Sequence, residues 1–314
     1  MKVLVGVDGS SNSFAAVEFV GRLLSADRDE IVLLYAAPEM AIADDERLDS
    51  AVLERARTAL SRAVLDEALL RLPKELHSRL ATPTPVGSGQ SPGAALLAAI
   101  DEHKADLIAV GFHGTSGIVE NFVLGSVSRT VVHTAKIPVL VVKAAVASET
   151  PAKLSPGSVA KQLHVLAPFD DPQFAEPTSA LLKKFTCPPE TRGWVMTVVR
   201  PMFVTELPDW LKVERNPDVA AMAAAWEVEH QQGMQAARNE LEKFRAQLPE
   251  CFASTELIVA EGRPAEEILA TAREKAIDLV VMGSRSSSSL KRLLLGSTSE
   301  QVLCEVPCSV LIVR

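Results

Sequence analysis

Aromatic side chains are scarce in this chain of 314 residues, where they make up 4% of the composition, with one tyrosine and three tryptophans. Proteins that bind single-stranded nucleic acid stack its bases on aromatic rings, so this scarcity speaks against such a surface. The formal net charge of −8 points the same way, because an acidic protein repels a phosphate backbone. We therefore expect no nucleic-acid partner.

A long apolar run is also missing from the sequence. No stretch reaches the ~20 apolar residues that a helix needs to cross a bilayer. The apolar residues that follow Met1 end at the acidic Asp8, which makes the stretch too short for a signal peptide. We therefore expect a cytoplasmic protein with no membrane contact.

Cysteine is sparse, and all four cysteines lie in the second half, at Cys187, Cys251, Cys304 and Cys308. The last two form C-x-x-x-C, a spacing that suggests a metal or redox pair. No second Cys or His pair with zinc spacing accompanies them, so we interpret both as small buried residues at a helix end and a strand start. No Ser-His-Asp order or paired-carboxylate signature stands out either, and we predict no catalytic residue and no protein metal site.

What the chain does contain is an internal repeat. Three apolar blocks of the first half return in the same order in the second half, at an offset that grows from 162 to 172 residues. The blocks are MKVLVGVD (1–8) with HVLAPFD (164–170), DLIAVG (106–111) with DLVVMG (278–283), and VLVVK (139–143) with VLIVR (310–314). We predict a first domain over 1–145, a linker rich in Ala, Ser, Pro and Lys over 146–161, and a second domain over 162–314.

Each copy alternates strand-like and helical patterns. The strand-like segments are continuous apolar runs, which are typical of parallel strands buried on both faces. Helical patterns lie between them, for example over Ser126–Thr134 and over the long segment Ala220–Leu248. The sequence therefore predicts two tandem doubly wound five-stranded parallel sheets of flavodoxin-like order, in a three-layer α/β/α fold.

Small and polar residues gather where the first and fourth strands of the first copy end. Asp8 and Gly9 follow the first strand, and Gly111-Phe112-His113-Gly114 follow the fourth. Ligands of doubly wound sheets bind at the carboxyl ends of the strands beside the switch point, so these residues should converge. Gly125-Ser126 opens a helix, whose free N–H groups and positive dipole end favour an anion.

These residues resemble the universal stress protein family. An Asp ending the first strand, then G-x-x-G, a nine-residue gap and G-[ST], is the pattern of its ATP-binding branch. The strings EGRPAEEILATAREKAIDLVVMGSRS (261–286) and LLLGSTSEQVL (293–303) are typical of the family. The resemblance covers nearly the whole chain, once per half. It implies an adenine-nucleotide-hydrolase-like fold that binds ATP in at least one of the two domains, with or without Mg²⁺, and acts in stress response or signalling with at most slow hydrolysis.

The resemblance also assigns residues to the nucleotide. In the first half, Asp8 and Ala36 would lie around adenine, and Gly9 would be a further binding residue. Ribose and phosphates would contact Val110, Gly111, His113, Gly114, Gly125, Ser126 and Val127. In the second half, the corresponding residues would be Asp170, Val199, Met282, Gly283, Arg285, Ser286, Gly296, Ser297 and Thr298.

Both copies depart from the family pattern. In the first, ten residues (115–124) rather than nine separate Gly114 from Gly125. In the second, the gap is nine residues but Ser286 replaces the second glycine, and its Cβ could crowd a phosphate. Asp171 stands where the first copy has Gly9, and it would oppose the phosphates unless a divalent metal lay between them. The alternative is therefore a non-nucleotide interaction scaffold with vestigial phosphate loops.

The last strand of each copy, at 139–143 and 310–314, should lie at a sheet edge, and family members commonly dimerise through this strand. An exposed edge is a template for pairing, and two fused copies can satisfy each other's edges. We predict a pseudo-twofold internal dimer, with a further homodimer left open.

Overall fold

The computed structural model describes residues 1–36, 50–79, 84–85, 91–114, 123–144, 162–200, 217–284 and 295–314. The proposed linker over 146–161 lies outside the described residues, as do Arg285 and Ser286 of the proposed second site.

Both halves repeat one order of strands and helices. The first half contains β1 (Lys2–Val7), α1 (Ser11–Leu23), β2 (Glu30–Tyr35), α2 (Ser50–Leu70), η1 (Lys74–Arg79), β3 (Thr84–Pro85), α3 (Pro92–His103), β4 (Leu107–Gly111), α4 (Ser126–Thr134) and β5 (Val139–Val142). The second half contains β6 (His164–Pro168), η2 (Pro172–Phe174), α5 (Ala175–Leu182), β7 (Arg192–Val199), α6 (Pro217–Arg245), η5 (Glu250–Phe252), β8 (Leu257–Glu261), α7 (Pro264–Glu274), β9 (Leu279–Gly283), α8 (Ser297–Glu305) and β10 (Ser309–Val313).

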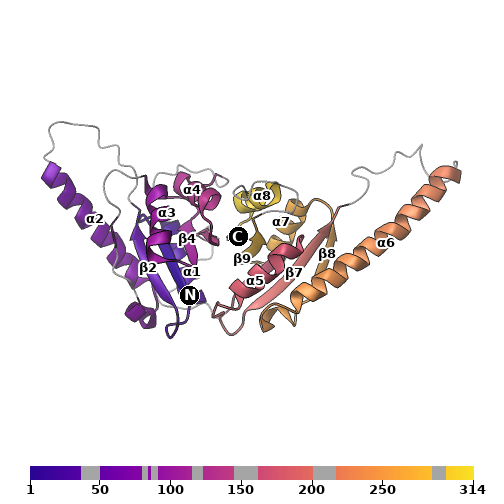
Figure 1. Ribbon diagram of the computed structural model, residues 1–314, viewed down its shortest axis with the longest axis horizontal. Coiled ribbons are helices and arrows are strands. Elements are labelled where there is room, and N and C mark those ends of the chain that lie inside the picture. Colours follow the sequence, from indigo (N-terminus) through magenta and orange to yellow (C-terminus); the bar gives the residue numbers. More distant parts are fainter. Residues whose placement is uncertain are drawn as a thin grey trace.

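The strands form one sheet in the order β3-β2-β1-β4-β5-β10-β9-β6-β7-β8. All neighbours within a half are parallel, and the halves meet where β5 and β10 pair antiparallel, with Leu311 opposite Leu140. The prediction that the two last strands pair within the chain is confirmed. Figure 1 shows the halves side by side, with the long helices α2 and α6 at opposite outer ends.

The doubly wound α/β class is as predicted, but the strand order within each half needs a correction. Each half has the order 3-2-1-4-5, whereas a flavodoxin-like order is 2-1-3-4-5. The third strand adds outside the second strand instead of beside the first. The first and fourth strands are therefore neighbours, and the switch point lies between them, as the placement of the site residues requires.

Helices cover both faces of the sheet and create two apolar cores that run through both halves. One core contains Val5 of β1 and Val281 of β9, together with side chains of α1, α2, α5 and α6. The other contains Leu4 of β1 and Val280 of β9, together with side chains of α3, α4, α7 and α8. Successive strand residues enter opposite cores because side chains alternate along a strand. This arrangement is the three-layer α/β/α fold.

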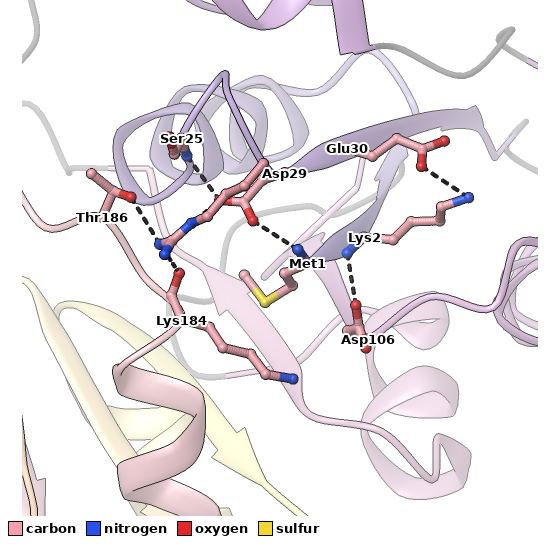
Figure 2. A network of polar contacts seen from close by, with 9 residues as sticks. Met1, Lys2, Ser25, Asp29, Glu30, Asp106, Lys184 and Thr186 are labelled. Atoms are coloured by element: carbon pink, nitrogen blue, oxygen red, sulfur yellow. Dashed lines mark hydrogen bonds and ion pairs between the residues drawn. The ribbon is translucent and has the colours of Figure 1, made fainter.

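An aspartate before the fourth strand anchors the first strand in each copy. Asp106 Oδ2 accepts the backbone N–H of Lys2 at 2.7 Å, as Figure 2 shows, and Asp278 Oδ2 accepts that of His164 at 2.8 Å. The Asp that opens each D-L-[IV] block in the sequence is therefore structural. It fixes where two neighbouring parallel strands begin, at their amino ends, which lie opposite the carboxyl ends where the site is proposed.

Two cations cross the boundary between the halves and cap helices on the other side. Lys143 follows β5, and its Nζ donates to the carbonyls of Cys304 at 3.0 Å and Val306 at 2.6 Å, at the end of α8. Arg314 follows β10, and its Nη2 donates to the carbonyl of Val132 near the end of α4. A cation at a helix C-terminus satisfies free carbonyls and complements the dipole. The two caps are related by the repeat.

A second contact between the halves lies on the other face of the sheet, where α1 and α5 end. Arg28 Nη2 donates to the Lys184 carbonyl at 2.5 Å and to Thr186 Oγ1 at 3.0 Å. The Thr186 N–H donates to the Leu23 carbonyl at 2.7 Å. Figure 2 shows Lys184 and Thr186 beside the network around Asp29. The halves are therefore joined on both faces of the sheet as well as through the pairing of β5 with β10.

Raising the pH from about 8 to about 10.5 is expected to stabilise the protein through Lys143. Burial lowers the pKa of Lys143 from 10.5 to about 8, against the opposing effect of the Cys308 and Cys304 thiols. In this window the unfolded chain holds the proton and the folded chain releases it, so the free energy of unfolding rises with pH. The difference between the two pKa values corresponds to an increase of at most about 3 kcal/mol in the free energy of unfolding.

Urea unfolding of the wild type and of Lys143→Met at about pH 7.5 and about pH 10 measures the effect, because the variant lacks this rise. A constant difference between the two proteins would contradict the assignment.

Candidate functional site

The loops that follow β1 and β4 lie against each other. Ser10 Oγ donates to the His113 carbonyl at 3.3 Å, and the Ser10 N–H donates to Asp8 Oδ1 at 2.9 Å. A Cβ added to Gly114 would stand 2.4 Å from Asp8 Oδ2, so the loop backbone passes directly over this carboxylate. Asp8 and Gly114 are therefore brought together from positions about a hundred residues apart.

The start of α4 joins this pair of loops. The Gly125 N–H donates to the Phe112 carbonyl at 2.9 Å, and Ser128 Oγ donates to the Gly111 carbonyl at 2.5 Å. Gly125 is the N-cap of α4, and no side chain caps this helix end, while Ser126 is exposed. The first-turn amides of α4 thus lie beside the loop after β4. A helix start of this kind can hold an anion.

Gly111 has a packing role that needs no ligand. A Cβ at Gly111 would stand 2.8 Å from both the Asn12 Cβ and the Ser13 backbone nitrogen, at the start of α1. Only glycine lets α1 pack this closely on the end of β4. Gly9 has a different requirement, because its φ of +88° lies in the left-handed region. Gly111 and Gly9 therefore shape the ends of β4 and β1 through their backbone.

His113 lies half-buried in the loop after β4, with its ring edge-on to Phe112 at a centroid distance of 4.5 Å. Burial lowers the pKa of His113, and the nearby charge of Lys143 lowers it further. A histidine with a lowered pKa is mostly neutral at pH 7, so it can offer a hydrogen bond and little charge to a phosphate.

Several apolar residues assigned to the nucleotide have buried side chains. Ala36, Val110 and Met282 belong to the core beneath α3, α4, α7 and α8, and Val127 packs against the same core from a half-buried position. Contacts from these residues to a ligand would come mainly from their backbone. Val199, at the end of β7, is half-buried.

The second half repeats the hydrogen bonds that hold the helix start. The Gly296 N–H donates to the Ser284 carbonyl at 2.8 Å, and Ser299 Oγ donates to the Gly283 carbonyl at 2.9 Å. Ser297 is exposed and Thr298 half-buried at the start of α8. The role of Ser128 and Ser299 was missed in the sequence. The recoverable signal is a serine two residues beyond G-[ST] in both copies.

Other features of the second half differ from the first. The Phe174 ring packs on Gly283, where an added Cβ would stand 2.6 Å from ring carbons. Asp171 is buried, and its carboxylate accepts the Gln173 N–H at 3.0 Å and Gln173 Nε2 at 2.7 Å. Asp171 therefore caps η2, which gives its charge a local partner. Desolvation raises the pKa of the neighbouring Asp170, the charge of Asp171 adds to the effect, and Arg200 opposes it.

Within the part of the chain that the structure describes, no group of three or more His, Cys, Asp or Glu side chains is arranged to hold a metal ion. None of the described helices combines the length and apolar character that spanning a membrane requires. Cys304 lies half-buried in the last turn of α8, and Cys308 is buried just before β10. The described site thus offers a carboxylate, backbone amides, a hydroxyl and a mostly neutral imidazole.

Comparison with known proteins shows which family the chain matches. The model of the universal stress protein family matches residues 1–143 and 212–314. A curated relative, universal stress protein YxiE of Bacillus subtilis, is 46% identical over 74 residues, which cover 24% of this chain and 50% of that protein. The matched stretch thus spans about half the length of this curated relative.

Two further matches extend over the whole chain. A universal stress protein of Mycolicibacterium smegmatis is 24% identical over 329 aligned residues, covering 99% of this chain and 96% of that protein. The crystal structure of a universal stress protein from Archaeoglobus fulgidus matches with a TM-score of 0.54 at 22% identity, covering 100% of this chain and 96% of that one. At this identity, the structural match speaks for the fold alone.

Proposed function

The chain belongs to the universal stress protein family, and from this premise we propose that its first half binds an adenine nucleotide, ATP, at the crevice between β1 and β4. The protein would act in the cytoplasm in stress response or signalling, with at most slow hydrolysis. Asp8 would accept hydrogen bonds from the adenosine, and the amides of Gly114, Ser126 and Val127 would donate to the phosphates.

One observation carries the proposal: the Asp8 carboxylate, the backbone of the loop after β4 and the uncapped start of α4 meet at one place. Glycine backbone lets phosphates approach closely, and the helix start favours their charge. The hydroxyl of Ser126 is exposed at the same helix start. The site therefore combines an acceptor for the nucleoside with donors for the phosphates, which supports the proposal.

The first half is the better candidate of the two. In the second half, Phe174 packs on Gly283, and the buried carboxylate of Asp171 lies one residue beyond Asp170. Both features make the second crevice less suited to a polyphosphate. Nucleotide binding there would rest on Asp170, Val199, Gly283 and the α8 start, with Arg285 and Ser286 contributing from outside the described residues.

Any Mg²⁺ would be bound mainly by the phosphates and by water. Mg²⁺ in nucleotide sites keeps several waters and uses few protein carboxylates. This suits a site in which the described residues contain no cluster of metal ligands.

Titration of the full chain with ATP and Mg²⁺, by calorimetry and by thermal shift, tests the proposal. We expect Asp8→Ala to weaken ATP binding about 10- to 100-fold, because a hydrogen bond to a charged group contributes about 1.5–3 kcal/mol. Asp101→Ala, which removes an exposed carboxylate on α3, is the matched control and should leave binding unchanged. No shift of the wild type at millimolar ATP would overturn the proposal.

A second candidate is a scaffold that binds a protein and has vestigial phosphate loops. The packing of Phe174 on Gly283 and the capping role of Asp171 favour it, because they give site residues of the second half purely structural roles. Mass spectrometry of the purified chain separates the candidates. A bound protein with no nucleotide in either half would favour the scaffold.

A further inference from the structure

One side chain of the first half reaches both the loop of the proposed nucleotide site and the second half. The Lys143 ammonium lies over the Phe112 ring, with Nζ 4.1 Å from the ring centroid. The same Nζ donates to the carbonyls of Cys304 at 3.0 Å and Val306 at 2.6 Å, where α8 ends. A cation this close to the face of an aromatic ring is attracted to it. Lys143 therefore links Phe112 to the end of a helix in the other half.

Phe112 holds the loop of the site against the start of α4. Its side chain is buried, and its carbonyl accepts the Gly125 N–H at 2.9 Å. Its ring contacts the ring of the next residue, His113, whose carbonyl accepts Ser10 Oγ at 3.3 Å. A shift of the Phe112 ring would therefore move the backbone that joins the loops after β1 and β4 to the start of α4.

The backbone on either side of Lys143 is fixed within the first half. The Phe112 N–H donates to the Val142 carbonyl at 2.8 Å, and the Ala144 N–H donates to Asn12 Oδ1 at 2.8 Å. Asn12 belongs to α1, so the end of β5 is tied both to the loop after β4 and to α1. The half-buried Lys143 side chain extends from this fixed backbone to the second half.

The second half repeats the helix cap with a different residue in the loop. Arg314 is the counterpart of Lys143, and it donates to the Val132 carbonyl near the end of α4. Ser284 stands where the first half has Phe112, and its N–H makes the equivalent hydrogen bond to β10 at 3.0 Å. A serine has no ring for a cation to contact. The repeat therefore separates the two roles of Lys143, because the cap occurs in both halves and the contact with a loop ring belongs to the first.

We propose that Lys143 is a positioning residue for the nucleotide site of the first half, where it holds the Phe112 ring, and with it the loop after β4, against the end of α8. Lys143 would act through Phe112 without touching the nucleotide. This inference rests on the proposed nucleotide site and adds that the second half supports it. Because coupling between two places in a molecule is reciprocal, nucleotide bound in the first half should also affect the end of α8.

Calorimetric titration of the full chain with ATP and Mg²⁺ tests the role. We expect Lys143→Met to weaken ATP binding about 5- to 30-fold, because the loop loses a partly desolvated contact between a cation and a ring. Lys143→Arg should bind ATP as the wild type does, since Arg314 caps a helix from the equivalent position. Lys275→Met is the matched control, because it removes a lysine that pairs with Glu256 at 2.8 Å in the second half, and it should leave binding unchanged.

A double variant separates positioning from a general loss of stability. Phe112→Leu alone should weaken ATP binding by a factor similar to that of Lys143→Met. Adding Lys143→Met to Phe112→Leu should then weaken binding less than about 2-fold further, because the ring through which Lys143 acts is already gone. Factors that multiply would show that the two side chains act independently and would overturn the proposal. Wild-type affinity in Lys143→Met would overturn it as well.

Hydrogen exchange without nucleotide tests the position of the loop separately from ATP binding. We expect the Gly125 amide, which is bonded to the Phe112 carbonyl, to exchange faster in Lys143→Met than in the wild type or in Lys275→Met. Unchanged exchange at Gly125 would overturn the proposal. Faster exchange in a chain whose wild type does not bind ATP would leave the positioning of the loop supported and would overturn the proposed function alone.

Hydrogen exchange with saturating ATP tests the coupling to the second half. In the wild type, exchange of the amides at the end of α8, where Val306 N–H donates to the Val302 carbonyl, should slow by roughly 5-fold. In Lys143→Met at saturating ATP, this slowing should be lost. A residue that merely stabilises the fold would not produce this difference. If ATP binds and the end of α8 exchanges at the same rate with and without it, the coupling is refuted.

Discussion

Replacing Leu311 with Asp is expected to unfold both halves of the molecule together. Leu311 is 0% exposed and lies in β10 opposite Leu140 of β5, at the only strand pairing between the halves within the described sheet. A buried carboxylate without a partner is among the most costly single changes, so we expect a loss of more than about 4 kcal/mol of unfolding free energy. Urea unfolding followed by circular dichroism measures it.

Leu311→Met is the control, since it conserves volume and should cost less than about 1.5 kcal/mol. Two probes then test whether the halves unfold as one unit. Tryptophan emission reports the second half, because all three tryptophans lie there, with Trp194 buried, and hydrogen exchange of β1 reports the first half. If β1 stays protected in Leu311→Asp while Trp194 becomes exposed, the halves are independent and the prediction is wrong.

Most of the fold prediction was based on the internal repeat. A block that ends in V-L-[VI]-V-[KR] in both copies identifies a last strand in each, and two free edges in one chain are enough to predict their pairing. Apolar periodicity also predicts where strands and helices lie. It does not predict which strand is the neighbour of which, because a crossover can return on either side. The position of β3 outside β2 could therefore not be predicted from the sequence.

The sequence predicted one part of the site correctly and misjudged another. Asp8 and Gly114 are brought together by the sheet itself, so knowing that β1 and β4 are neighbours was sufficient. From the sequence, Asp171 was interpreted as a charge that would oppose the phosphates, and its role as a helix cap was missed. Asp followed by Pro172 is a helix-start signature, and this local capping gives its carboxylate a partner within two residues.

Replacing Gly114 with Val is expected to abolish ATP binding to the first half, with a loss of about 100-fold or more in affinity. A Cβ at this position would stand 2.4 Å from Asp8 Oδ2, which is well inside van der Waals contact. Either the carboxylate or the loop must move, and each is required by the proposed site. A change of about 2.7 kcal/mol in binding free energy corresponds to the expected factor. Calorimetric titration with ATP and Mg²⁺ measures it.

Gly233→Ala is the matched control, because Gly233 lies within α6 and a Cβ there has no atom within 4 Å. This variant should bind ATP as the wild type does and gain up to about 1 kcal/mol in stability, since alanine favours a helix interior. The two glycine variants thus separate loss of the site from the general effect of adding a side chain. If Gly114→Val folds and binds ATP with wild-type affinity, the nucleotide does not use the crevice above Asp8, and the second half becomes the place to look for it.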